Sequence, residues 1–448
     1  MASNKRISLG VIAVLTASLA MDLVFITPCA ANPFPNPPVI QSSFQFWLAI
    51  YTRYTLTEGV VHDSRYPGIV YEVIDLKHPD APEAHRINAV RMRQARKKLR
   101  DRIDRLIQNP NSGDSDLVRL AAIIGPPLSA DRLRQARRRV RCQVGQRDRF
   151  REGLVRSSPY INAIRRIFRD AGIPEDLAYL AHVESSFNNH AHSKSGAAGI
   201  WQFTRETGRH FLRIDHTVDE RLDPIRASEA ASLLLKTNFR RLKSWPLAIT
   251  AYNHGIAGMR RAKRRHRTYA AIFEKYHTRR FRFASRNFYP EFLAAREAAI
   301  NAEVYFDHLP PRDERSVFYV SHDGFVAFSD AARHFKLDAD LLQRLNPALQ
   351  SSVLNGLQRI PKTYRLCLPA HEWRFRLAYN AKIPEPMLWV RQKSFPIYRV
   401  RKGDTLASIA KRHRLRVADL IAANNLSNQG NRIIVNQKLR LPLRDRSL

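Results

Sequence analysis

One carboxylate in the sequence stands where an apolar helix face is expected. Leu177, Leu180, Ala181 and Glu184 are spaced i, i+3, i+4 and i+7, so they share one side of a helix. A carboxyl group on such a face loses hydration, and this raises its pKa. An acid that stays protonated near neutral pH can protonate a leaving oxygen, as glycoside cleavage requires. On periodicity alone, an ordinary, partly exposed glutamate near a helix end is the better explanation of the pattern.

The segment around this glutamate is helical by pattern, from about residue 157 to residue 305. Gly172-Ile173-Pro174 ends one helix and begins the next, with Pro174 at a favoured first-turn position. Asp223 is placed to cap a helix rich in Ala and Leu that Pro224 opens. These signals predict an all-α domain.

Three short motifs occur in order in that segment. They are Glu184-Ser-Ser-Phe-Asn, Gly196-Ala-Ala-Gly-Ile-Trp-Gln-Phe and Ala251-Tyr-Asn-His-Gly. Together they resemble the catalytic domain of the soluble-type lytic transglycosylases, in the membrane-bound murein transglycosylase D branch. The resemblance covers about residues 157–305. It implies a lysozyme-like fold, a peptidoglycan substrate, and neither a metal nor an organic cofactor.

The resemblance also assigns roles to matching residues. Glu184 falls at the position of the catalytic acid/base. The expected substrate-binding residues are Ser193, Ser195, Trp201, Gln202, Tyr252 and Asn253. The departure is Ile200-Trp201, where many members have Leu-Met. The indole of Trp201 either stacks on a sugar ring or packs in the core, and the sequence leaves both open.

Other polar residues in the segment admit simpler explanations. A hydrolase would need a second catalytic carboxylate, and Asp219, Glu220 and Asp223 are the candidates. Asp223 is better explained as a helix cap, and Asp219 and Glu220 can pair with Arg221. A single glutamate fits the lytic transglycosylases, in which the C6 hydroxyl of muramic acid replaces water as the nucleophile. His190 and His192 suggest a solvated loop, because no third metal ligand follows from spacing.

The C-terminal part contains a repeated strand–helix–helix–strand pattern. Tyr398-Arg-Val-Arg-Lys-Gly-Asp-Thr-Leu opens the clearer copy and Lys438-Leu-Arg-Leu-Pro closes it. Residues 397–442 resemble a LysM domain, a module that binds glycans containing N-acetylglucosamine. The expected glycan-binding residues are Asp404, Thr405, Leu406, Asn425 and Leu426. Residues 316–370 resemble a degenerate LysM, and glycan binding there stays open.

The N-terminal part resembles a leader followed by a basic region. Lys5 and Arg6 precede an apolar run, so residues 1–31 are predicted to be a secretory signal segment that is cleaved, retained, or lipidated at Cys29. A proline-rich linker is expected at 32–40. Residues 32–156 are predicted to be basic and mainly helical, with helices at Ala84 to Gln108 and after a Ser129 cap. Their role does not follow from the sequence.

Composition limits the remaining choices. The net charge of +35 draws the chain to polyanions. Anionic envelope polymers are possible partners, whereas nucleic acid is not expected, since no zinc-finger or RNA-binding motif is present. Cys29, Cys142 and Cys367 lie in different predicted parts of the chain, so no disulfide is predicted.

These observations predict a multidomain protein with an all-α, lysozyme-like catalytic domain and one or two C-terminal β-α-α-β LysM modules. The expected activity is that of a lytic transglycosylase on peptidoglycan glycan strands, in the periplasm or cell envelope, as a monomer. A lysozyme-like hydrolase acting on peptidoglycan or chitin is the alternative enzyme. A non-catalytic wall-binding scaffold is the alternative outside enzymes.

Overall fold

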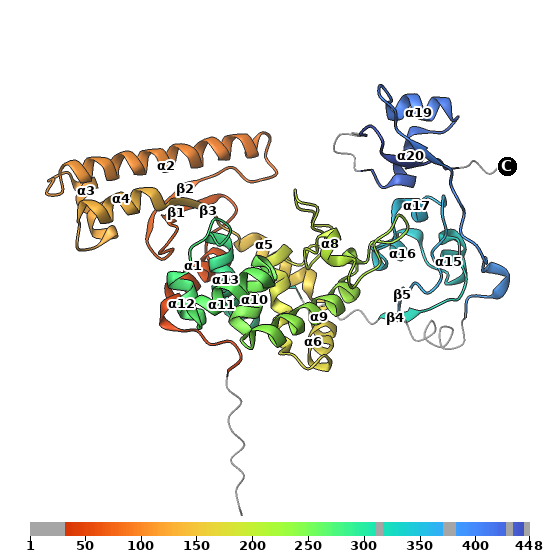
Figure 1. The fold of residues 1–448 in the computed structure, drawn as a ribbon, viewed down its shortest axis with the longest axis horizontal. Coiled ribbons are helices and arrows are strands. Elements are labelled where there is room, and N and C mark those ends of the chain that lie inside the picture. The colour runs from red at the N-terminus through yellow and green to blue at the C-terminus, as the bar shows by residue number, and fades with distance from the viewer. Residues whose placement is uncertain (1–31, 311–316, 371–381, 427–432, 443–448) are drawn as a thin grey trace, which may run out of the picture.

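The computed structural model describes residues 32–310, 317–370, 382–426 and 433–442. The predicted signal segment, with Cys29, lies outside the described residues. Figure 1 shows an N-terminal arm at the left, a central helical body, and two C-terminal modules at the right, the second above the first. Across the described ranges, the helices lack the combination of length and apolarity needed to cross a membrane. Cys142 and Cys367 are both free thiols.

The helical body is built mainly from the segment in which helices were predicted. Its α-helices are α6 (Ile161–Asp170), α7 (Leu180–Ser185), α8 (Arg205–Gly208), α9 (Pro224–Leu242), α10 (Trp245–His254), α11 (Ile256–His266), α12 (Tyr269–Lys275), α13 (Phe283–Ile300) and α14 (Ala302–Tyr305). Two short 3₁₀ helices, η1 (Glu175–Tyr179) and η2 (Glu220–Leu222), precede α7 and α9. Asp223 caps α9 as predicted, because its Oδ1 accepts hydrogen bonds from the backbone N–H groups of Ile225 and Arg226.

The N-terminal residues belong partly to this body. Helix α1 (Pro38–Thr52) packs along α13, and α5 (Arg147–Ser157) packs against α1 and α7. The linker predicted at 32–40 is wrong, because Phe34 is buried against the rings of Trp245 and Phe292. The boundary predicted at 156/157 therefore falls inside one packing unit.

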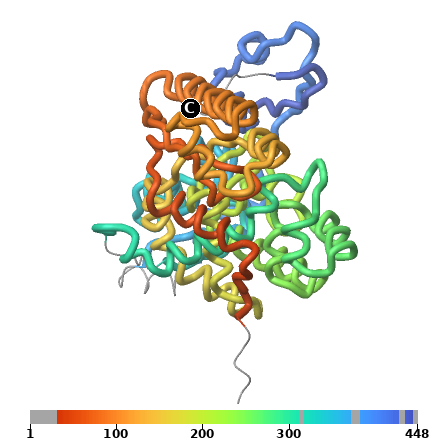
Figure 2. The backbone as a smooth tube through the Cα atoms, turned by 90° about the vertical axis from the view of Figure 1, so that its left-hand side faces the viewer, coloured from red at the N-terminus to blue at the C-terminus, as the bar shows by residue number. Residues whose placement is uncertain are grey.

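The rest of the N-terminal region forms the arm. Its elements are β1 (Glu58–Asp63), β2 (Val70–Asp75), α2 (Ala84–Gln108), α3 (Ser115–Ile124), α4 (Ala130–Arg139) and β3 (Val140–Val144). Helix α2 has the predicted bounds, and Ser129 caps α4 as predicted. The antiparallel sheet, in the order β2-β1-β3, was not predicted. Leu99, Ile103 and Leu133 pack the helices onto it. Figure 2 views the chain from the side of this arm, drawn in orange.

The two C-terminal modules repeat one design. The first contains β4 (Val317–Val320), α15 (Phe328–His334), α16 (Ala339–Leu345), α17 (Ser351–Leu354) and β5 (Leu366–Pro369), followed by a 3₁₀ turn, η3 (Glu385–Met387). The second contains β6 (Ile397–Arg399), α19 (Leu406–Arg412), α20 (Val417–Asn424) and β7 (Lys438–Arg440). In each, the first and last strands pair antiparallel, so the repeat read from the sequence corresponds to two similar units.

The first module is docked onto the helical body through a loop between α8 and η2. Val218 of that loop is 0% exposed and packs in the module's own apolar core. Around it, Asp219 N–H donates to Ala348 O at 2.8 Å, and Gln350 N–H donates to Thr217 O at 2.9 Å. A β-like backbone pairing and a buried side chain thus fix the module to the body.

Candidate active site

Glu184 lies in the last turn of α7, one residue before the helix ends. The helix stops because Ser186 and Phe187 both adopt left-handed backbone angles, with φ of 49° and 55°. Such angles are strained for residues with side chains. The burial of Phe187, which is 1% exposed, holds the turn in place. Ser185 adds a link to the glycine-rich loop by donating from its Oγ to Ile200 O at 3.0 Å.

The surroundings of Glu184 favour its protonated form. Burial, followed by the charge of Glu291, raises the pKa of Glu184 to about 8. The neighbouring His182 is neutral, because burial lowers the pKa of its imidazole to about 3, so it does not stabilise the ionised form of Glu184. His182 instead stacks on the ring of Phe150 and meets the edge of Phe187. The carboxyl can therefore serve as a general acid near neutral pH.

Glu184 opens onto a pocket of about 390 Å³ between α7 and α5. The lining residues are Gln146, Arg149, Glu152, Arg156, Val183, Glu184, Ser185, Ser186 and Asn188. Arg156 is tied to the turn after the glutamate, since its Nε and Nη2 donate to Ser186 O at 3.0 and 2.9 Å. The N-terminal region therefore supplies one wall beside the acid.

The glycine-rich loop is held by a buried arginine. Arg221 donates from Nη1 to Gly196 O at 2.8 Å and to Phe203 O at 3.0 Å. Gly199 has a φ of 78°, and a Cβ there would lie 1.7 Å from Arg221 O, so only glycine fits. Gln202 closes the loop by donating from Nε2 to Ala191 O and Gly199 O.

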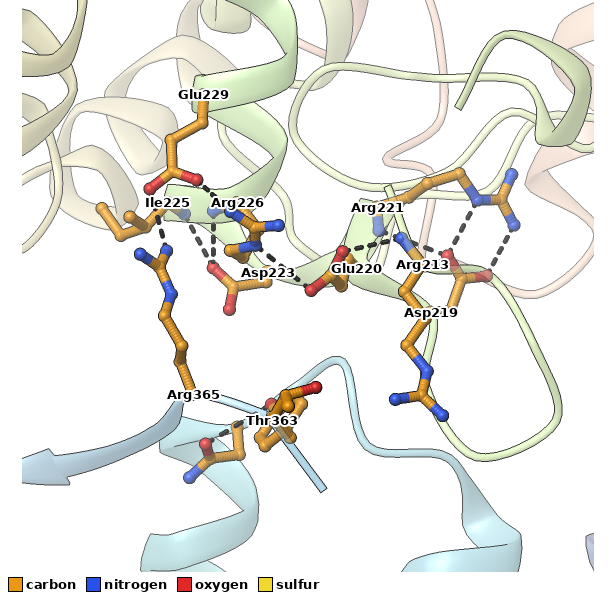
Figure 3. A network of polar contacts seen from close by, with 12 residues as sticks. Arg213, Asp219, Glu220, Arg221, Asp223, Ile225, Arg226, Glu229, Thr363 and Arg365 are labelled. Atoms are coloured by element: carbon orange, nitrogen blue, oxygen red, sulfur yellow. Dashed lines mark hydrogen bonds and ion pairs between the residues drawn. The ribbon is translucent and has the colours of Figure 1, made fainter. Parts of the chain in front are cut away.

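Figure 3 shows that the three alternative carboxylates have structural partners. Asp219 forms a bidentate, buried ion pair with Arg221, at 2.9 and 2.7 Å. Glu220 accepts from Arg226 Nε at 3.1 Å, and Asp223 caps α9. Glu229 of α9 also pairs with Arg365 of the first module at 2.8 Å. These partners account for Asp219, Glu220 and Asp223 without a catalytic role.

The remaining predicted binding residues divide into surface and core. Ser193 is half-buried and Ser195 is exposed, and their hydroxyls lie 2.9 Å apart. Tyr252 donates from Oη to Trp201 O at 2.8 Å, and its pKa is raised by burial and then by the charge of Glu184. Asn253 Oδ1 accepts from Ser285 Oγ of α13 at 2.9 Å. Tyr252 is therefore close enough to Glu184 to sense its charge.

The sugar-stacking role considered for Trp201 is wrong. The indole is 0% exposed, packs on Phe168, and donates from Nε1 to Ser228 Oγ at 2.7 Å. Core packing, the other interpretation, is therefore correct, and the backbone carbonyl of Trp201 accepts the hydrogen bond from Tyr252. His190 and His192 lie in the loop after α7, and no group of three metal-binding side chains occurs within the described residues.

Two residues of the site were missed by sequence reasoning. Glu291 of α13 accepts from Tyr51 Oη of α1 at 2.9 Å. Burial raises the pKa of Glu291 to about 8, although Tyr51 and Arg141 act in the opposite direction. Tyr51 senses the charges of both Glu291 and Glu184, and these add to burial in raising its pKa. The site thus contains a second acidic group that belongs to none of the three motifs.

The predicted glycan-binding residues of the second module are partly engaged. Asp404 Oδ2 accepts from Tyr398 Oη and from Arg401 N–H, each at 2.7 Å. Thr405 caps α19, and Leu406 is buried in the module core with Leu426 packed beside it. Asn425 donates from Nδ2 to His216 O of the helical body at 3.1 Å. The end of the expected groove therefore faces the docking loop.

Comparisons with known proteins agree with the motifs. The chain matches the Transglycosylase SLT domain over residues 163–273 and the LysM domain over residues 398–442. It is 27% identical over 323 residues to membrane-bound lytic murein transglycosylase D of Escherichia coli K12, covering 68% of this chain and 69% of that protein. The same values hold for the protein of that name from Escherichia coli O6:H1. Glu184 and Tyr252 lie inside the matched domain, whereas Tyr51 and Glu291 lie outside it.

Proposed function

For a chain that carries a transglycosylase SLT domain followed by a LysM domain, we propose that it is a lytic transglycosylase of peptidoglycan. It cleaves the β-1,4 bond between N-acetylmuramic acid and N-acetylglucosamine and leaves a 1,6-anhydro end. The observation that carries this proposal is the half-buried Glu184, whose raised pKa of about 8 suits an acid.

The chemistry needs one group that first gives and then takes a proton. Glu184 protonates the glycosidic oxygen, and the bond from that oxygen to C1 of the muramic acid breaks. The carboxylate that remains then accepts the proton of the C6 hydroxyl as this oxygen bonds to C1. The hydroxyl is tethered to the reacting sugar, which gives it a large effective concentration over water.

The other residues fit supporting roles. Ser193, Ser195, Gln202, Tyr252 and Asn253 contact the glycan strand in this proposal. Peptidoglycan is the wall polymer that the LysM module would hold, and the charge of +35 would favour anionic envelope polymers. We therefore place the protein in the periplasm or cell envelope, in keeping with the membrane-bound name of the relatives.

The test is product analysis on purified murein. The proposal predicts muropeptides that end in 1,6-anhydro-N-acetylmuramic acid, which mass spectrometry separates from hydrolysis products by the mass of one water. Glu184→Gln keeps the shape but removes the transferable proton, so the rate should fall by about 10²–10⁴-fold. Glu303→Gln, at an exposed glutamate of α14, is the control and should act like the wild type.

Two results would contradict the proposal. New reducing ends in the products would identify a hydrolase. A fully active Glu184→Gln variant would remove this residue from the mechanism.

A further inference from the structure

Helix α13 carries a carboxylate on its apolar face. Glu291 lies three residues after Phe288 and four before Ala295, and these two neighbours are only 4% and 0% exposed. Its side chain accepts a hydrogen bond from Tyr51 Oη at 2.9 Å, a partner from the far N-terminal side of the sequence. A buried carboxylate is costly unless something compensates for it, and a single tyrosine hydroxyl is a modest compensation.

The packing brings Glu291 and Glu184 into one environment. Helix α13 packs against both α1 and α7. Tyr51 of α1, Ala294 of α13 and Val183 of α7 belong to a single apolar cluster. Val183 directly precedes Glu184, and Ala294 follows Glu291 by three residues, which is about one helical turn. The carboxyl groups therefore share a low-dielectric surrounding in which charges act strongly on one another.

We propose that Glu291, held by Tyr51, is a positioning residue that opposes the ionisation of Glu184 and so widens the pH range in which Glu184 stays an acid. This inference rests on the proposed function, since it concerns the same acid. It gives residues 38–52 a part in the chemistry: α1 supplies the hydroxyl that favours the ionised form of Glu291. Glu291 itself acts through Glu184 and exchanges no proton with the sugar.

The direction of the electrostatic effect follows from the partners of each group. Burial raises the pKa of Glu291 to about 8, and Tyr51 and Arg141 act against this rise. Once Glu291 is ionised, its charge adds to burial in raising the pKa of Glu184. The two carboxyls therefore titrate as a coupled pair, in which the charge of one member disfavours ionisation of the other.

Other charged groups face the pair and have to be considered. Tyr252 of α10 senses Glu184 but stays neutral, because burial and that charge raise its pKa. From α5, Arg149, Glu152 and Arg156 line the pocket beside Glu184, and Arg156 is engaged by Ser186 O and Glu152. On the side of Glu291, His62 is neutral, because burial lowers its pKa to about 4. Arg141 is the cation that acts on Glu291, and it lies over the ring of Phe283.

The test measures the rate of anhydro product release against pH. Activity that needs protonated Glu184 falls as the pH rises through its pKa, which sets the alkaline limb of the profile. Glu291→Gln removes the neighbouring charge, so the limb should move to lower pH by about one unit. Tyr51→Phe removes the hydrogen bond that favours ionised Glu291, so it should move the limb in the same direction. Glu291→Asp keeps a charge and should restore part of the wild-type profile.

The two substitutions act on one pathway, so the double variant Tyr51→Phe/Glu291→Gln should match Glu291→Gln alone. Glu297→Gln is the matched control: this residue lies on the same helix and also accepts from a tyrosine, Tyr305. Its profile should coincide with that of the wild type. Tyr51→Phe tests the idea through a conservative change if Glu291→Gln fails to fold.

The outcomes separate this inference from the proposed function. An unmoved limb in both Tyr51→Phe and Glu291→Gln, even with a lower rate, would overturn the inference while anhydro products still support the lytic reaction. Reducing ends that disappear in Glu291→Gln would instead make Glu291 a water-activating base, and this would overturn both. A wild-type enzyme without product would refute the proposed function and, with it, the inference that rests on it.

Discussion

The ion pair between Asp219 and Arg221 is expected to hold the glycine-rich loop, and breaking it should be costly. Both side chains are nearly inaccessible, at 4% exposure for Asp219 and 3% for Arg221, and the pairing is bidentate. Arg221→Met leaves Asp219 as a buried, unpaired charge, and such a change typically costs about 3–5 kcal/mol. Two carbonyls, Gly196 O and Phe203 O, also lose their donor. Arg205, at 3.9 Å from Asp219, can compensate only in part.

Asp219→Asn should be milder. It removes the charge but keeps the side-chain shape, and Arg221 retains its two carbonyl acceptors. We expect about 2 kcal/mol for this change, in the range of a lost charged hydrogen bond. For a body of this size, 1 kcal/mol corresponds to about 2–4 °C in thermal midpoint. Arg221→Met should therefore lower the midpoint by roughly 6–20 °C, and Asp219→Asn by roughly 4–8 °C.

The assay is differential scanning calorimetry of both single variants and the double variant, followed by turnover measured well below the lowest midpoint. The loss of unfolding free energy in the double variant should be smaller than the sum of the two single losses, by about 0.5–3 kcal/mol, because the double variant leaves no unpaired charge. Turnover by Asp219→Asn should stay within a few-fold of the wild type. A wild-type midpoint combined with a large loss of turnover would refute this reasoning and return Asp219 to the list of catalytic carboxylates.

Three further expectations address the core, the docked module and the LysM domain. Trp201→Phe should lower the free energy of unfolding by about 2–3 kcal/mol, through a lost hydrogen bond and a small cavity, without changing KM. A raised KM at an unaltered thermal midpoint would indicate that the indole contacts the sugar. Val218→Asp should speed hydrogen exchange at the Gln350 amide, because it puts a charge into the module core. Val390→Asp, at a valine that is 91% exposed, is the control. Equal exchange at the Gln350 amide in both variants would contradict the docking role of Val218. Deleting residues 397–448 should weaken sedimentation with insoluble peptidoglycan at high salt, where surface charge is screened. The deletion should leave cleavage of soluble glycan fragments intact. Undiminished binding to peptidoglycan would argue against the LysM assignment.

Local signals predicted the parts of the fold that depend on local contacts. The basic helical stretch predicted at Ala84 to Gln108 is α2, and the caps at Ser129 and Asp223 are formed by the side chains expected to form them. Each of these features is decided within one or two helical turns. The motifs also led to the domains that the comparisons find.

Features that depend on distant contacts were not predicted. The central strand β1 pairs with β3, which follows only after α2, α3 and α4, and nothing within the β1 segment indicates that partner. The prolines at 32–40 suggested a linker, yet Phe34 packs against aromatic rings of α10 and α13, more than two hundred positions away in the sequence. Trp201 was ambiguous for the same reason, because a motif position does not reveal which face of an indole is covered.

Glu291 is the instructive case, since a local signal for it was present. It shares the helical spacing of Phe288, Phe292 and Ala295, the same kind of pattern that singled out Glu184. What the pattern could not supply was the tyrosine from α1 or the adjacency to α7, and without them the residue has no role. The matched transglycosylase domain at 163–273 contains the acid but neither Tyr51 nor Glu291. If the charge of Glu291 sets the protonation of Glu184, the working catalytic unit begins at α1 and ends with α13, and the N-terminal region is part of the enzyme rather than an attachment to it.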